Sequence, residues 1–277
     1  PHLVDTCGTG GSGLKLFNIS TAAAFVAAAA GAHVAKHGNR KMTSFSGSAD
    51  VLEAAGVSLA LSPDQVGRCI SEIGVGFLFA QAHHSAMRFA GPVRQEIGIR
   101  TLMNVLGPMT NPAGAMRQLI GVFSPQWQQK MVEVLMLLGT QHAMIVHSDG
   151  LDEIRLDADT TVVELQGGAI TSYTIQPSDL PISTHSPAAI AALTAQSSDE
   201  RLQLVREALG DETSAAADIV SLNAGAAIYV AGVAKTLRDG VVMAKDAIAS
   251  GLANERLEEL VATSSLMAEQ NSESNDL

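Results

Sequence analysis

The stretch Cys7-Gly8-Thr9-Gly10-Gly11-Ser12-Gly13, followed by Asn18-Ile19-Ser20-Thr21 and an alanine-rich run, indicates how this chain folds. A short apolar strand is predicted over residues 2–6, before the glycines, and a buried helix over residues 20–30, after them. Glycine lets the backbone approach a ligand closely. Successive amides form a concave anion nest, and a helix N-terminus adds unpaired N–H groups. This order predicts a phosphate-binding loop, although such turns also join strands to helices without any ligand.

The composition points to an enzyme with a large, closely packed core. The chain has 277 residues, of which 47% are hydrophobic and only 4% aromatic, and its mean hydropathy is +0.21. A net charge of -11 disfavours binding to nucleic acid. Cys7 and Cys69 show no disulfide or metal-ligand spacing, so we expect both to be reduced and buried. No secretory signal or membrane span is apparent, so we expect a cytoplasmic protein. The chain begins at Pro1, and we expect residues upstream of it.

Strand and helix patterns alternate along the chain, which predicts an α/β fold with a mainly parallel central sheet flanked by helices. Gly167-Gly168 separates two β patterns and predicts a hairpin at one side of the sheet. From Ser186 onward the pattern is helical, with a frayed end. Further strands are predicted at 33–36, 75–80, 119–123, 143–147, 160–165 and 169–175, and helices at 48–55 with Ser48 as N-cap, from Ser62-Pro63, at 92–103 and at 126–138.

A second polar loop follows the strand at 33–36. Lys36 and Arg40 can neutralise phosphate charge there, and Asn39 can hydrogen-bond a sugar or phosphate. Taken alone, this spacing is more typical of a solvated basic loop. Two such loops after strands of a parallel sheet lie at the same carboxyl edge, where open α/β sheets bind ligands. We therefore expect a substrate with more than one phosphate.

The acidic segment Asp149-Gly150-Leu151-Asp152-Glu153 follows the strand at 143–147. Alone it is typical of a surface turn. At the same sheet edge as two phosphate loops, it favours Mg²⁺, which binds through one or two carboxylates together with substrate phosphates.

The segment from His83-His84 to Arg94 adds candidates for the cleft. Arg94 can bind a carboxylate with two hydrogen bonds. The paired histidines have no third zinc ligand at a suitable spacing. No serine nucleophile elbow or P-loop lysine signature occurs. The glycine loop is not a dinucleotide fingerprint either, because the second strand ends in Lys36-His37 rather than an acid.

The motifs together resemble the anthranilate phosphoribosyltransferase family. The resemblance extends to about Arg238, and its motifs are Gly8-Thr9-Gly10-Gly11, Asn18-Ile19-Ser20-Thr21, Lys36-His37-Gly38-Asn39-Arg40, Ser46-Gly47-Ser48-Ala49-Asp50, Pro92-Val93-Arg94, Gly107-Pro108, Asn111-Pro112 and Asp152-Glu153. It implies phosphoribosyl transfer from 5-phosphoribosyl 1-pyrophosphate to anthranilate, in tryptophan biosynthesis, with two Mg²⁺ ions and a homodimer. It also implies an α/β domain (1–80 and 115–277) and part of a smaller helical domain (81–114), whose N-terminal helices are absent here.

The resemblance assigns roles to individual residues. Lys36, Arg94 and Glu153 are the implied catalytic residues. Ser20, Asp152 and Glu153 are the implied metal ligands, and Gly8, Asn39 and Arg94 the implied anthranilate contacts. The implied phosphoribosyl pyrophosphate contacts are Gly8, Gly11, Ser12, Leu16, Asn18, Ile19, Ser20, Thr21, Lys36, His37, Gly38, Asn39, Arg40, Ser44 and Ser48.

Two positions depart from the family pattern, in which Asp is usual at Ser12 and Thr or Ser is common at Leu16. Losing that carboxylate predicts altered affinity or metal dependence rather than loss of activity. The alternatives are a pyrimidine nucleoside phosphorylase and a non-catalytic member that binds nucleic acid. The context of Arg94 and Asn39 argues against the first, and the acidic chain with its Asp152-Glu153 pair argues against the second.

Overall fold

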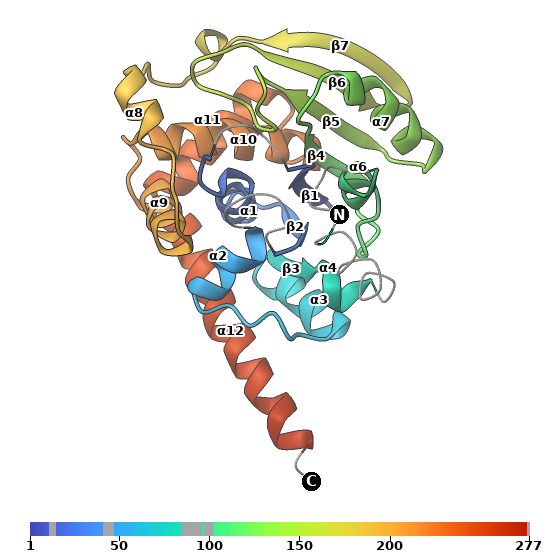
Figure 1. The fold of residues 1–277 in the computed structure, drawn as a ribbon, viewed down its shortest axis with the longest axis vertical. Coiled ribbons are helices and arrows are strands. Elements are labelled where there is room, and N and C mark those ends of the chain that lie inside the picture. Colours follow the sequence, from blue (N-terminus) through green and yellow to red (C-terminus); the bar gives the residue numbers. More distant parts are fainter. Residues whose placement is uncertain (11–14, 41–46, 85–95, 97–101, 276–277) are drawn as a thin grey trace.

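A seven-stranded sheet with the order β3-β2-β1-β4-β5-β6-β7 forms the centre of the computed structural model (Figure 1). The structure describes residues 1–10, 15–40, 47–84, 96 and 102–275. The first five strands in chain order run parallel to one another. The sixth strand pairs antiparallel with the fifth, and the seventh pairs antiparallel with the sixth. This arrangement confirms the predicted mainly parallel sheet. The strands are β1 (Leu3–Gly8), β2 (His33–Gly38), β3 (Val75–Phe79), β4 (Arg117–Gly121), β5 (His142–His147), β6 (Thr160–Gln166) and β7 (Ala169–Ile175).

The predicted hairpin is confirmed at one edge of the sheet. Gly167 and Gly168 connect β6 to β7 with φ values of 57° and 82°. Positive φ at both turn residues fits the right-handed twist of a two-residue hairpin. β7 is the edge strand, and most of its residues are exposed.

Helices cover both faces of the sheet. Along β5, Met144 and Val146 join the large core around α1 and α10, whereas Ala143 and Ile145 join a smaller core beneath α7. This alternation follows from the two-residue period of a strand. The helices are α1 (Ile19–Ala29), α2 (Ser48–Ala54), α3 (Pro63–Glu72), α4 (Ala80–His83), α6 (Met103–Leu106), α7 (Gln126–Leu137), α8 (Pro187–Ala191), α9 (Ser198–Gly210), α10 (Ala215–Ala231), α11 (Leu237–Ala249) and α12 (Leu252–Asn275). Figure 1 shows α12 extending outward with the C-terminus.

Small side chains allow the helices to pack closely, as the composition predicted. Nine of the eleven residues of α1 are buried, and most of them are alanine. At the contact between α10 and α11, a Cβ on Gly225 would lie 2.6 Å from the backbone nitrogen of Val241. Alanine and glycine therefore bring α1, α10 and α11 close enough to form a continuous core on one face of the sheet.

Two helix starts illustrate how side chains set the boundaries. Ser62 caps α3 and accepts a hydrogen bond from Gln65, with Pro63 in the first turn, as predicted. The N-cap of α2 is Gly47 rather than the predicted Ser48. The Gly47 N–H donates to the Asp50 carboxylate at 2.7 Å, which starts the helix one residue earlier.

Several other predictions are only partly tested. Cys69 is buried and Cys7 half-buried, and both are free. The helix predicted at 92–103 lies almost wholly outside the described residues. The division into a domain of residues 1–80 and 115–277 and a helical part at 81–114 stays a prediction.

No single helix in the described part of the chain is long and apolar enough to cross a membrane. One bent pair, α9 with α10, passes that test by length and composition alone.

Candidate active site

Three of the predicted segments converge at the carboxyl edge of the parallel strands. The glycine loop follows β1, the Lys36–Arg40 segment ends β2, and the acidic loop follows β5. A small pocket at this edge is lined by Thr6, Cys7, Ser20 and Glu153, among others. Ligands bind at this edge in open α/β sheets because the strand ends leave loops and helix N-termini free to face them.

Lys36 in β2 contacts two of the residues that line this pocket. Its side chain is buried, and its ammonium donates hydrogen bonds to the Thr6 carbonyl oxygen at 2.6 Å and the Ser20 hydroxyl at 3.2 Å. Burial lowers the pKa of Lys36, while the carboxylates of Asp5 and Glu153 oppose that shift. The chain thus places a cation next to the first turn of α1.

Asp152 is held against the glycine loop. Its Oδ2 accepts a hydrogen bond from the Gly10 N–H at 2.9 Å. A Cβ on Gly8 would lie 2.7 Å from the same oxygen, and a Cβ on Gly121 would overlap the backbone carbonyl of Asp152. The acidic loop can therefore lie against β1 and β4 only because glycine occupies both positions.

Glu153 lies at the N-terminus of α1, where the positive end of the helix dipole favours a carboxylate. Burial and the neighbouring Asp152 charge raise the pKa of Glu153 to about 8, although Lys36 and hydrogen bonds from Ser20 oppose this shift. Two adjacent acids repel each other, and a divalent cation would relieve that repulsion.

Several predicted ligand residues carry buried polar atoms without a hydrogen-bond partner in the described structure. These atoms are Asn18 Oδ1, Thr21 Oγ1 and His37 Nε2. Buried polar groups are normally paired, so unpaired atoms around a helix N-terminus favour a polar ligand there. His37 also lies edge-to-face with His84, with 5.0 Å between ring centroids.

Arg40 has a different environment from the one its motif predicted. Its guanidinium binds both carboxylate oxygens of Glu53, at 2.6 and 2.7 Å, and lies 5.6 Å from the Phe79 ring centroid. Asn39 accepts a hydrogen bond from the Arg40 N–H at 2.8 Å. Arg40 is thus engaged in an exposed ion pair, and a phosphate contact would have to compete with Glu53.

Other predicted residues lie near the site or outside the described chain. Ile19 begins α1, and the Leu16 carbonyl accepts a hydrogen bond from Arg201 at 2.5 Å. A Cβ on Gly38 would overlap the Ser48 hydroxyl, so these two residues touch. Gly11, Ser12, Ser44 and Arg94 lie outside the described residues.

The sequence analysis missed three residues of this site. The Thr6 carbonyl accepts a hydrogen bond from Lys36. The buried Asp5 carboxylate accepts one from the His37 N–H at 3.1 Å, and the buried Asn223 holds the backbone of Ile154. Two sequence signals could have indicated these residues. Asp5 is a single acid in a mainly apolar strand, and Asn223 is a single amide in the alanine-rich α10.

Comparisons with known proteins identify the family to which this chain belongs. A family model described as the α/β domain of a glycosyl transferase family matches residues 1–254. The anthranilate phosphoribosyltransferase of Ectopseudomonas mendocina is 54% identical over 275 residues, which cover 98% of this chain and 78% of that protein.

Solved structures give the same result. Anthranilate phosphoribosyltransferase from Thermus thermophilus matches with a TM-score of 0.87 and 46% identity, covering 95% of this chain and 78% of that one. The Saccharomyces cerevisiae enzyme in complex with PRPP and Mg matches with a TM-score of 0.83 and 26% identity, covering 95% of this chain and 74% of that one. This chain therefore belongs to the anthranilate phosphoribosyltransferase family.

Proposed function

We propose that this chain transfers the phosphoribosyl group of 5-phosphoribosyl 1-pyrophosphate (PRPP) to the amine of anthranilate. The products are N-(5-phosphoribosyl)anthranilate and pyrophosphate, in the second step of tryptophan biosynthesis from chorismate. One observation carries the proposal. The glycine loop, the first turn of α1, Lys36 and the Asp152-Glu153 pair meet at one sheet edge. That combination suits a substrate with several phosphates and a bound divalent cation.

The reaction makes one bond and breaks one. The anthranilate nitrogen bonds to the anomeric carbon while the bond from that carbon to pyrophosphate breaks, and the nitrogen then releases a proton. The arylamine is weakly basic, so its lone pair is available without a strong general base. Lys36 and the N–H groups at the start of α1 would stabilise the departing pyrophosphate. Asn39 and Arg94, with Gly8, would position anthranilate.

The residues present fit Mg²⁺. Among the described residues, no group of three or more His, Cys, Asp or Glu side chains could hold a metal unaided. Mg²⁺ does not need such a group, because it usually binds one or two carboxylates together with water and substrate phosphates. We assign Ser20 and Glu153 to one ion and Asp152 and Glu153 to a second. When bound, the ions would neutralise charge developing on pyrophosphate.

The remaining assignments follow the family motifs. The PRPP contacts would be Gly8, Gly11, Ser12, Leu16, Asn18, Ile19, Ser20, Thr21, Lys36, His37, Gly38, Asn39, Arg40, Ser44 and Ser48. We further propose that the protein acts in the cytoplasm as a homodimer, without a nucleic-acid partner.

The decisive experiment follows anthranilate fluorescence with PRPP while Mg²⁺ is titrated, in the protein and its Ser12→Asp variant. We expect decay that requires both PRPP and Mg²⁺ in both proteins, with an altered Mg²⁺ requirement in the variant. No decay in either protein would refute the assigned reaction. Decay in the variant alone would show that the site is correct and that Ser12 disables it.

A parallel assay tests the alternatives. Phosphorolysis of thymidine or uridine, in place of anthranilate consumption, would identify a pyrimidine nucleoside phosphorylase. Binding of nucleic acid without either activity would identify a non-catalytic member.

A further inference from the structure

Asn223 is a fully buried amide near the middle of α10. Its Oδ1 accepts a hydrogen bond from the Ile154 N–H at 2.9 Å. Its Nδ2 donates to the Ile154 carbonyl oxygen at 2.9 Å and to the Ile219 carbonyl oxygen at 2.9 Å. One side chain thus pairs with both backbone groups of Ile154, and both of its amide hydrogens are used.

The position of Ile154 gives this contact its importance. Ile154 directly follows Glu153, so the N–H that Asn223 holds belongs to the peptide group that links the two residues. Asn223 also lines the same pocket as Glu153 and Ser20. α10 thereby restricts the backbone from which the Glu153 carboxylate projects.

The acidic loop is held from its other side as well. The Gly10 N–H binds the Asp152 carboxylate at 2.9 Å. The loop that carries Asp152 and Glu153 is therefore held by two contacts distant in sequence, one from Gly10 in the glycine loop and one from Asn223 in α10.

We propose that Asn223 is a positioning residue for the Mg²⁺-PRPP site, acting through the backbone of Ile154 on Glu153. This inference rests on the proposed function, because it assumes that Glu153 binds Mg²⁺. Partners that orient metal ligands typically change metal affinity or activity by about 10- to 100-fold when they are removed. We assign Asn223 no direct hydrogen bond to a substrate, because its amide groups are engaged by Ile154 and Ile219.

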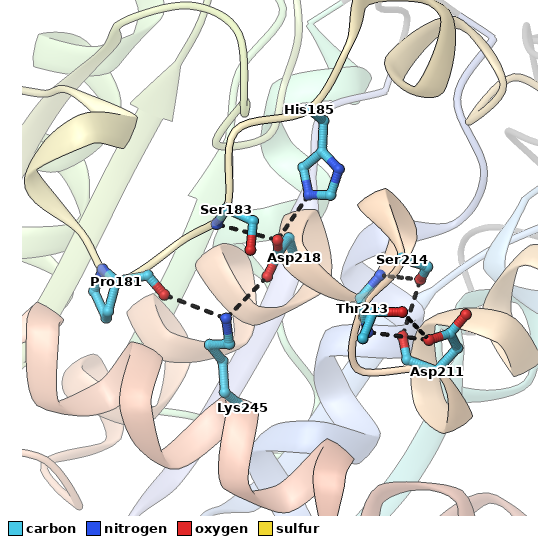
Figure 2. Close-up of polar contacts among 9 residues, drawn as sticks. Pro181, Ser183, His185, Asp211, Thr213, Ser214, Asp218 and Lys245 are labelled. Atoms are coloured by element: carbon cyan, nitrogen blue, oxygen red, sulfur yellow. Dashed lines mark hydrogen bonds and ion pairs between the residues drawn. The ribbon is translucent and has the colours of Figure 1, made fainter.

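If Asn223 only stabilised the fold, its loss would lower the unfolding temperature without changing PRPP affinity. A second buried residue of α10 offers a matched control. Asp218 is also buried in α10, where it accepts hydrogen bonds from His185 at 2.7 Å, Ser183 at 3.2 Å and Lys245 at 3.3 Å (Figure 2). These contacts join α10 to residues 183–185 and to α11, and not to the acidic loop. Asn223 lies five positions after Asp218, which turns the two side chains about 140° apart around the helix. Asp218→Asn therefore perturbs the same helix without touching the acidic loop.

The test measures binding as well as turnover. Isothermal titration calorimetry gives the affinity for PRPP in saturating Mg²⁺ without anthranilate, and thermal unfolding gives stability. For Asn223→Ala we expect PRPP affinity and kcat to fall by about tenfold or more, with the KM for anthranilate within about twofold of the wild type. Asp218→Asn should lower the unfolding temperature but leave PRPP affinity unchanged. Asn223→Ser introduces no buried charge and can still bond the Ile219 carbonyl within the helix, but it loses the paired contact with Ile154. It should lower PRPP affinity as Asn223→Ala does, and it serves as the second variant if the alanine variant does not fold.

Two results would overturn the inference. One is wild-type PRPP affinity in the folded Asn223 variants together with a lower unfolding temperature. The other is an equal loss of affinity in Asp218→Asn. If the wild type consumes no anthranilate, the proposed function fails, and calorimetry with Mg²⁺ and PRPP still decides whether Asn223 positions the loop.

Discussion

Acidification should destabilise this protein through His37. The imidazole lies in β2, where burial, followed by the charge of His84, lowers its pKa from 6.5 to about 4. The charges of His83 and Lys36 contribute to the same shift, and a hydrogen bond with Gly107 opposes it. As pH falls, the unfolded chain binds this proton first. The stability that neutral His37 contributes is therefore complete above pH 6.5 and is lost as pH falls toward 4.

The size of this effect follows from the two pKa values. Each pKa unit corresponds to about 1.4 kcal/mol, so the full shift is worth roughly 3 kcal/mol. At pH 5 the unfolded imidazole is almost fully protonated and the folded one mostly neutral. The free energy of unfolding should then be about 2 kcal/mol lower than at pH 8, from this group alone.

Urea unfolding of the protein and its His37→Gln variant at pH 8 and pH 5 tests this reasoning. Carboxylates and other histidines also titrate in this range, but they contribute to both proteins and largely cancel in the comparison. The wild type should lose about 2 kcal/mol more than the variant between the two pH values. Equal losses in the two proteins would refute the argument that buried His37 stays neutral in the folded state.

Four substitutions test the site itself. Glu153→Gln should lower kcat for anthranilate consumption far more than it changes the KM for anthranilate; normal turnover would remove Glu153 from the metal site. Lys36→Met should lower kcat by about 100-fold or more, because it removes a cation beside the departing pyrophosphate. Arg94→Ala should mainly raise the KM for anthranilate, and an unchanged value would exclude it from the acceptor site. Gly121→Ala should cost about 1–3 kcal/mol in urea unfolding, whereas Gly67→Ala, with no atom within 4 Å of the added Cβ, should be neutral or slightly stabilising.

The sheet edge was predictable because its signals are local. Glycine after β1, Lys36 at the end of β2 and acids after β5 each follow a recognisable strand, and parallel strands bring their carboxyl ends together. The hairpin at Gly167-Gly168 was predictable for the same reason, since a two-residue turn needs positive φ at both positions.

The supporting contacts were not predictable, because their partners are far apart in the sequence. Asn223 and Ile154 are separated by 69 residues, and Gly10 and Asp152 by 142. Nothing in a local pattern distinguishes such a polar side chain from one that simply caps a neighbouring turn. The ion pair between Arg40 and Glu53 likewise depends on how α2 packs beside β2, so a motif that suggested a phosphate ligand could not show its competitor.

The charges around the pocket explain why divalent cations should be required rather than merely helpful. Lys36 is a buried cation that contacts Thr6 and Ser20, two of the residues that line the pocket. Burial lowers its pKa, and the nearby carboxylates of Asp5 and Glu153 oppose that shift. Asp152 adds a further acid beside Glu153. Three acids, Asp5, Asp152 and Glu153, thus lie around one ammonium, and burial and the Asp152 charge already disfavour ionisation of Glu153. The phosphates of PRPP would bring more negative charge to the same place. Binding becomes favourable when Mg²⁺ neutralises both sets of anions, so PRPP affinity measured by calorimetry should fall steeply as Mg²⁺ is withdrawn. Tight PRPP binding without any divalent cation would contradict this account of the site.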